Sequence, residues 1–101
     1  MPIYFVSRHA GAIEWVRGQN IQVDVFVAHL DPAQVGAGDT IIGSLPVNLA
    51  AEICARGAAY WHVSVKLPAD LRGQELSADD LTQLNARLER FTIQALYGTQ
   101  P

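Results

Sequence analysis

The stretch IYFVSRHAGAIEWVR (residues 3–17) decides the fold. The continuous apolar run at residues 3–6 is typical of a strand that is buried on both faces, as in a parallel sheet. Residues 7–11 predict a turn, and residues 12–17 predict a short helix that ends at Gly18. A buried strand that leads into a helix favours a parallel sheet covered by helices.

The rest of the chain continues this alternation of short elements. Further strands are predicted at residues 22–29, 40–43 and 60–65, with one helix at residues 46–56 and a long final helix from Ser77 through Ala95. Together these elements predict one α/β domain over residues 1–101. We expect a small Rossmann-like parallel sheet of about four strands, in the order 2-1-3-4, with helices on both faces.

The predicted final helix has the clearest local pattern. Ser77 and Asp80 have the spacing of a capping box. Apolar residues then repeat at intervals of four and three, which predicts one stripe that serves as core or as a dimer seam. The stripe consists of Leu81, Leu84, Leu88, Phe91 and Ala95.

Composition excludes several classes of protein. Half of the 101 residues are hydrophobic and 17% are charged, so disorder is excluded for the chain as a whole. A formal net charge of −3 argues against a surface that coats duplex nucleic acid, but it leaves room for a local basic pocket. Cys54 is the single cysteine and is expected to pack as a small apolar residue. With no leader pattern and no apolar run of about 20 residues, we expect a cytoplasmic protein without a membrane anchor.

The predicted strand order places a ligand crevice where the chain reverses direction, outside the carboxyl ends of the first and third strands. The first crevice loop carries Ser7, Arg8 and His9, which we predict to be catalytic, and Gly11, which we predict to bind ligand. Arginine pairs with phosphate through two hydrogen bonds, and histidine exchanges a proton near neutral pH. The alternative is a capped turn with polar groups facing solvent.

The second crevice loop contributes four predicted ligand-binding residues, Gly43, Ser44, Pro46 and Asn48. Glycine lets a ligand approach the backbone, and the serine and asparagine suit a base or a ribose. The alternative is a plain turn before a helix that starts at proline. Lys66 and Arg72 flank the loop after the last predicted strand; they reach a ligand phosphate, or they are ordinary solvated cations.

Other polar residues favour structural roles. His29, Asp31 and Asp39 could hold a metal, but their spacing matches no strong ligand pattern. His62 lies inside a predicted strand, where a histidine is usually structural. The two tryptophans could stack on a base but are expected in the core or in an interface. We therefore expect no metal and no cofactor.

Five segments in order carry a resemblance. They are IYFVSRHAGAIEW (3–15), HLDP (29–32), GSLPVNLAAE (43–52), RGA (56–58) and LRGQEL (71–76). In this order and spacing the chain resembles a small family of CRISPR-associated accessory proteins found beside type III systems. The resemblance runs from Pro2 to about Phe91.

The resemblance implies a ligand and two activities. Type III systems signal with cyclic oligoadenylates, so it implies a ring nuclease that opens cyclic tetra-adenylate, or a non-catalytic sponge or sensor that binds it. A two-fold symmetric ring also suits a homodimer. On chemical grounds Arg8 suits the developing charge, His9 the leaving-group proton, and the serines and Asn48 the orientation of phosphate or sugar. Two other readings stay open: an interaction protein acting through the final stripe, and a small enzyme acting on another nucleotide.

Overall fold

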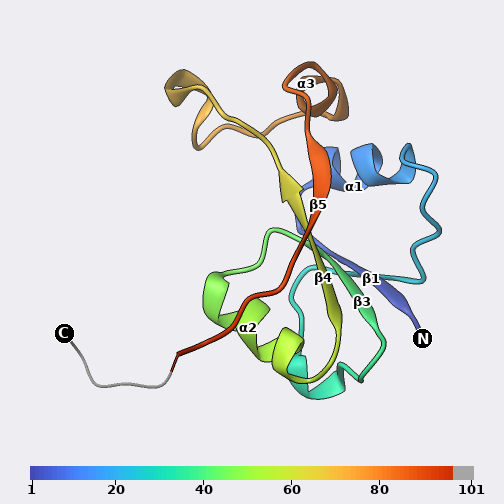
Figure 1. The fold of residues 1–101 in the computed structure, drawn as a ribbon. Helices are drawn as coiled ribbons and strands as arrows, with labels where there is room; N and C mark the ends of the chain where they lie inside the picture. The colour runs from blue at the N-terminus through green and yellow to red at the C-terminus, as the bar shows by residue number, and fades with distance from the viewer. Residues whose placement is uncertain (97–101) are drawn as a thin grey trace.

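Five strands form one sheet in the order β2-β1-β3-β4-β5 in a computed structural model, which describes residues 1–96 (Figure 1). The strands are β1 (Ile3–Val6), β2 (Val25–Val27), β3 (Thr40–Gly43), β4 (Ala59–Ser64) and β5 (Arg87–Phe91). The α-helices of the described part are α1 (Ala10–Arg17), α2 (Val47–Ala55) and α3 (Ala78–Gln83). Two 3-10 turns, η1 (Pro32–Gln34) and η2 (Ala69–Leu71), lie in the connections.

The first four strands are parallel and follow the predicted order 2-1-3-4, so the α/β class and the switch point are confirmed. Strand β2 is shorter than predicted. The Asp24 N–H donates to the Ile3 carbonyl at 2.8 Å, but the Ile3 N–H donates to the Asp24 carboxylate at 2.7 Å instead of to a backbone carbonyl. The ladder between β1 and β2 therefore begins at Val25.

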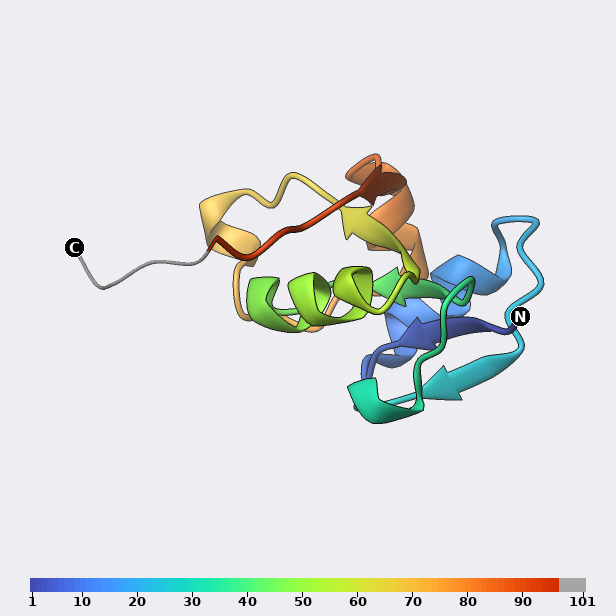
Figure 2. The same cartoon turned by 60° about the horizontal axis from the view of Figure 1, so that its bottom comes forward.

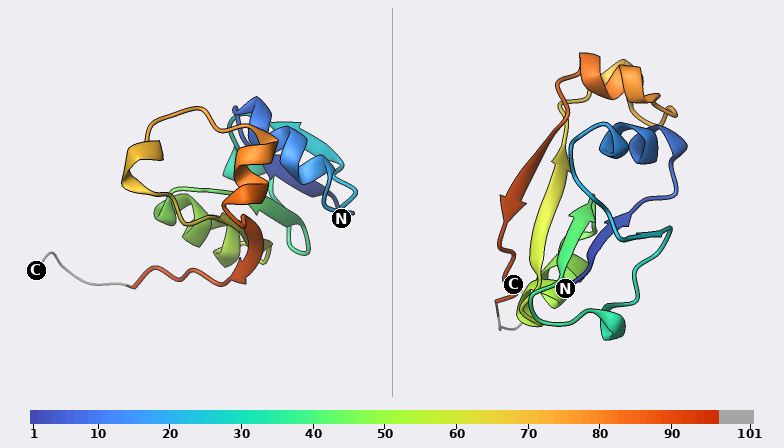
Figure 3. Two further views of the ribbon diagram at one scale, coloured as in Figure 1. Left: turned by 90° about the horizontal axis from the view of Figure 1, so that it is seen from above. Right: turned by 90° about the vertical axis from the view of Figure 1, so that its right-hand side faces the viewer.

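Helices cover both faces of the sheet, as predicted (Figure 3). One core joins Phe5 and Ile42 to Trp15 and Val16 of α1 and to Leu81 of α3. The other core lies on the opposite face, because neighbouring strand residues point to opposite sides. It contains Ile41 and Tyr60 of the sheet, Ala50 and Ile53 of α2, and Val35 and Ala58 from the flanking loops.

The prediction of one long final helix from Ser77 through Ala95 is wrong. Helix α3 ends at Gln83, because Asn85 takes a left-handed conformation with φ of 58°. The Ala86 N–H then bonds the Leu81 carbonyl, and the Asn85 N–H bonds the Thr82 carbonyl, which is the Schellman pattern that ends helices. Of the predicted stripe, only its first member, Leu81, is fully buried, and it lies on α3.

The chain then reverses into a strand that the sequence analysis missed. Strand β5 pairs antiparallel with β4, with Leu88 opposite Val63. Antiparallel edge strands are exposed on one side, and Phe91 accordingly remains 42% exposed. The following residues 92–96 run past α2 (Figures 1 and 2). Within residues 1–96, no helix has the length and apolar character needed to cross a bilayer.

Candidate functional site

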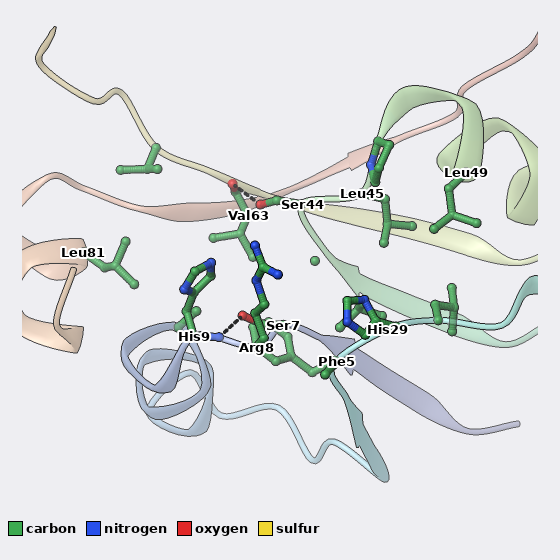
Figure 4. A pocket seen from close by; sticks show the side chains of 17 residues that line it. Phe5, Ser7, Arg8, His9, His29, Ser44, Leu45, Leu49, Val63 and Leu81 are labelled. Carbon is green, nitrogen blue, oxygen red and sulfur yellow. Dashed lines mark hydrogen bonds between the residues drawn. The ribbon is translucent and has the colours of Figure 1, made fainter. Parts of the chain in front are cut away.

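A cleft of about 550 Å³ opens at the carboxyl ends of the parallel strands, at the predicted switch point between β1 and β3 (Figure 4). The ends of β1, β2 and β3 each contribute a loop to it. The lining residues that carry polar side chains or that were predicted to bind ligand are Ser7, Arg8, His9, His29, Gly43, Ser44 and Pro46. The structure therefore brings together six of the ten predicted site residues.

The Ser7–His9 wall is ordered by backbone bonds. The Ser7 N–H donates to the Val27 carbonyl at 2.9 Å, which ties the ends of β1 and β2 together. The Ser7 hydroxyl accepts the His9 N–H at 3.1 Å, and His9 is the extended residue that precedes α1. This turn leaves the side chains of Arg8 and His9 exposed and directed toward the side of the cleft where Ser44 and Val63 lie (Figure 4).

His9 also contacts a segment that is distant in sequence. Its Nδ1 lies 2.7 Å from Oε1 of Glu75, in the loop before α3. Nearby, the backbone of Gly11 packs on the Leu76 carbonyl so closely that a Cβ on Gly11 would lie 1.9 Å from that oxygen. Gly11 is not among the cleft-lining residues, and its lack of a side chain is explained by this packing.

The Gly43–Pro46 wall is held by one buried side chain, Tyr60. Its hydroxyl accepts the Leu45 N–H at 3.0 Å and lies 3.2 Å from the Gly43 carbonyl and 2.6 Å from His62 Nδ1. The phenol has one proton, so it donates to one of these two acceptors at a time. Burial raises the pKa of Tyr60, although the hydrogen bond from Leu45 opposes this effect.

Contacts within the protein also involve two predicted ligand-binding residues of this wall, Gly43 and Ser44. A Cβ on Gly43 would lie 2.9 Å from the Val6 carbonyl, so the glycine lets β3 and β1 pair closely at their ends. The Ser44 hydroxyl donates to the Val63 carbonyl at 3.4 Å, a long bond that a ligand could replace (Figure 4).

The residues that line the cleft differ in charge from the chain as a whole, and the Glu75 carboxylate contacts His9 from outside this lining. Its only ionisable side chains are Arg8, His9 and His29, and none of the described residues that line it is a carboxylate. The chain as a whole carries a net charge of −3. Clefts with one sign of charge concentrate ligands of the opposite sign. This arrangement suits a phosphate-bearing ligand.

Sequence reasoning missed three residues of this region. His29 follows β2 just as Arg8 and His9 follow β1, and parallel strands end at the same edge, so the strand assignment already carried its signal. Tyr60 and Glu75 carried no such signal, because their contacts join positions that are 15 or more residues apart.

The remaining predicted residues are not among those that line the cleft. Asn48 borders a second hollow of about 520 Å³, between α2 and residues 92–95. Lys66 and Arg72 lie in the connection between β4 and α3, which projects from the sheet (Figure 1). Neither side chain lines the cleft, although Val65, the residue before Lys66, does.

Several structural expectations are confirmed. The Asp31 carboxylate accepts the Ala33 N–H at the start of η1, and the buried Asp39 accepts the Gly36 N–H. His62 has a structural role, because its Nδ1 is hydrogen-bonded to the Tyr60 hydroxyl. Trp15 is buried in the core. The capping box of Ser77 and Asp80 forms in both directions.

The fold and the cleft define the class: a small Rossmann-like α/β protein whose switch-point cleft is lined by Arg8 and two histidines. Within that class, residues 4–94 match the family model described as "Putative CRISPR-associated protein (Cas_VVA1548)". The chain therefore belongs to this CRISPR-associated family, which confirms the resemblance at that level. Comparison with curated proteins and with solved structures gives no match.

Proposed function

We propose that this protein is a ring nuclease that opens a cyclic oligoadenylate, with cyclic tetra-adenylate as the preferred ring, and so ends the antiviral signal of a type III CRISPR system. The observation that carries the proposal is the cleft at the carboxyl ends of the strands, where Arg8 and His9 lie together and no described lining residue is a carboxylate. Membership of a CRISPR-associated family supports the choice of messenger.

The reaction uses a nucleophile that the ligand supplies. The ribose 2′-oxygen attacks the adjacent phosphorus in line with the P–O5′ bond, and that bond breaks. Solvent takes the 2′-OH proton, and the His9 imidazolium gives a proton to the departing 5′-oxygen. The Arg8 guanidinium faces the negative charge that develops on phosphorus oxygens. The product is a linear oligoadenylate that ends in a 2′,3′-cyclic phosphate.

The dimensions of the cleft bear on the assembly. A volume of about 550 Å³ lies within the range of about 300–1,000 Å³ that holds one drug-sized ligand. A ring of four nucleotides is larger than such a ligand. A two-fold homodimer would offer two equivalent clefts to a two-fold symmetric ring, and we include the homodimer in the proposal.

The test is incubation of the purified protein with cyclic tri-, tetra- and hexa-adenylate in EDTA, read by chromatography and mass spectrometry. We expect multiple turnovers and linear products with cyclic phosphate ends. Arg8→Ala should slow opening by about 100-fold or more, whereas Arg56→Ala, which removes an arginine paired with Glu52 on α2, should not.

The same samples separate the alternatives. Intact ring that co-elutes with the protein from a desalting column would replace the nuclease with a sponge or sensor. Intact ring that elutes separately would overturn the nucleotide assignment altogether. Equal loss of activity in both arginine variants would remove Arg8 from the site.

A further inference from the structure

We infer that Glu75 is a positioning residue that orients the His9 imidazole, and that the backbone contact between Gly11 and Leu76 sets the distance between them. The catalytic consequence rests on the proposed function, but the positioning itself does not. His9 Nδ1 and Glu75 Oε1 lie 2.7 Å apart, although 66 residues separate them in the chain.

The pair contributes little to folding. The side chains of His9 and Glu75 are 53% and 72% exposed, and ion pairs between exposed groups add little to stability. What the pair does fix is one ring orientation on the rim of the cleft. His9 lines the cleft while its Nδ1 is bonded outside it, so Nε2 is the nitrogen left for a ligand.

The backbone brings the two side chains together. Because Gly11 has no Cβ, the first turn of α1 packs directly against the Leu76 carbonyl. Glu75 immediately precedes Leu76, and the Ser77–Asp80 capping box immediately follows it and fixes the start of α3. Main-chain packing therefore places the Glu75 backbone within reach of His9, and the hydrogen bond between the two side chains sets the final orientation.

The chemistry follows from the bonding of Nδ1. When the imidazole is neutral, a carboxylate on Nδ1 selects the tautomer with the proton on that nitrogen. When the ring is protonated, the same carboxylate accepts the Nδ1–H and leaves the Nε2–H to donate to the 5′-oxygen. Without Glu75 the ring turns freely and both tautomers form, so productive orientation becomes rare.

The test reads the ring directly by ¹⁵N NMR of histidine-labelled protein. We expect the Nδ1–H tautomer at His9 in the wild type and in Glu75→Gln, whose amide oxygen still accepts. We expect loss of that preference in Glu75→Ala. Glu52→Ala, which breaks the exposed pair with Arg56 on α2, is the control and should leave the His9 signals unchanged.

Kinetics on cyclic tetra-adenylate then add the catalytic consequence. Glu75→Ala should lower kcat by about 10- to 100-fold while KM changes little, and Glu75→Gln, which keeps an acceptor for Nδ1–H, should restore most of the activity. An unchanged tautomer in Glu75→Ala would overturn the positioning role, whatever the activity. A wild type that shows the tautomer but opens no ring would overturn the proposed function and the catalytic consequence, and would leave the positioning standing.

Discussion

The Ser7–His9 wall and the Gly43–Pro46 wall face each other across the cleft but are held in different ways. The first is held by the Ser7 N–H bond to Val27 and by the turn bond from His9 to Ser7, and it presents the exposed His9–Glu75 pair at its rim. The second is held by Tyr60, which is 2% exposed and whose hydroxyl contacts the Leu45 N–H and the Gly43 carbonyl.

This difference separates residues that act on a ligand from residues that stabilise the fold. Exposed side chains exchange protons and meet a ligand, but they add little to folding. A buried hydroxyl with backbone partners reaches no ligand, but its loss leaves a polar group without a partner. Substitutions in the first wall should therefore change activity at constant stability, and substitutions behind the second should change stability first.

The largest effect is expected at His9. His9→Ala should lower the rate of ring opening by about 100-fold or more, because it removes the group that protonates the leaving oxygen. Its urea unfolding curve should overlay that of the wild type, since the side chain is half-exposed. A His9→Ala protein that cleaves at the wild-type rate would remove the catalytic role from this wall.

Gly11 follows the first wall, in the first turn of α1, and its contact is main chain to main chain. Gly11→Ala should lower the free energy of unfolding by about 3 kcal/mol, since the new Cβ would meet the Leu76 carbonyl at 1.9 Å. Gly18→Ala is the matched control at the other end of α1. Its Cβ would lie 3.4 Å from the nearest atom, so we expect a change within about 0.5 kcal/mol. Equal effects in urea denaturation would show that the close approach is not what matters.

The second wall is tested by Tyr60→Phe. Removal of the hydroxyl leaves the Leu45 N–H without its acceptor and should cost about 2 kcal/mol in urea unfolding. Tyr4→Phe removes a hydroxyl from a half-buried tyrosine packed on the same core, and should cost less than about 0.5 kcal/mol. A neutral Tyr60→Phe would mean that this wall does not depend on the buried hydroxyl.

A smaller effect is expected at Asn85, which lies between α3 and β5. Helix α3 starts beside Glu75, and β5 brings Phe91 against His62, the partner of Tyr60. Asn85→Ala should cost about 1 kcal/mol, because alanine is strained at φ of 58°. Asn85→Gly should be neutral or stabilising, as measured by thermal unfolding. The opposite ranking would contradict the left-handed helix end.

The smallest effect is a slope with pH. Burial raises the pKa of the Tyr60 phenol above its ordinary value of 10.0. Above that pH the unfolded chain releases the proton while the folded chain keeps it, so folding stability should fall as pH rises. Urea unfolding between about pH 8 and 11 should show a shallower decline for Tyr60→Phe than for the wild type. Parallel declines would contradict the burial effect.

Much of both cleft walls could be predicted from local sequence. Buried runs in β1 and β3 predict parallel strands, and the switch-point rule then brings Ser7, Arg8, His9, Gly43 and Ser44 to one edge. His29 could have been added by the same rule. The role of Gly11 was assigned to a ligand, because a glycine in a turn does not show whether a ligand or a distant backbone occupies the space beside it.

The final stripe shows why periodicity alone can mislead. Leucines at 81, 84 and 88 fit one helix face, but they also fit a short helix followed by a strand. Asn85 decides between these, because asparagine tolerates the left-handed conformation that ends a helix. The pairing of β5 with β4 then supplies backbone hydrogen bonds that a longer helix would have made internally.

The sequence by itself determined the α/β class, the order of the four parallel strands, the capping box and the candidate residues that follow β1 and β3. These depend on hydrophobic period and on turn residues, which act over a few positions along the chain. Only the tertiary structure decided that Glu75 meets His9, that Leu76 excludes a side chain at Gly11, and that Tyr60 holds the loop after β3. Each of these contacts joins segments that are far apart in the chain and meet only when the sheet and its helices pack. No local sequence pattern therefore predicts them.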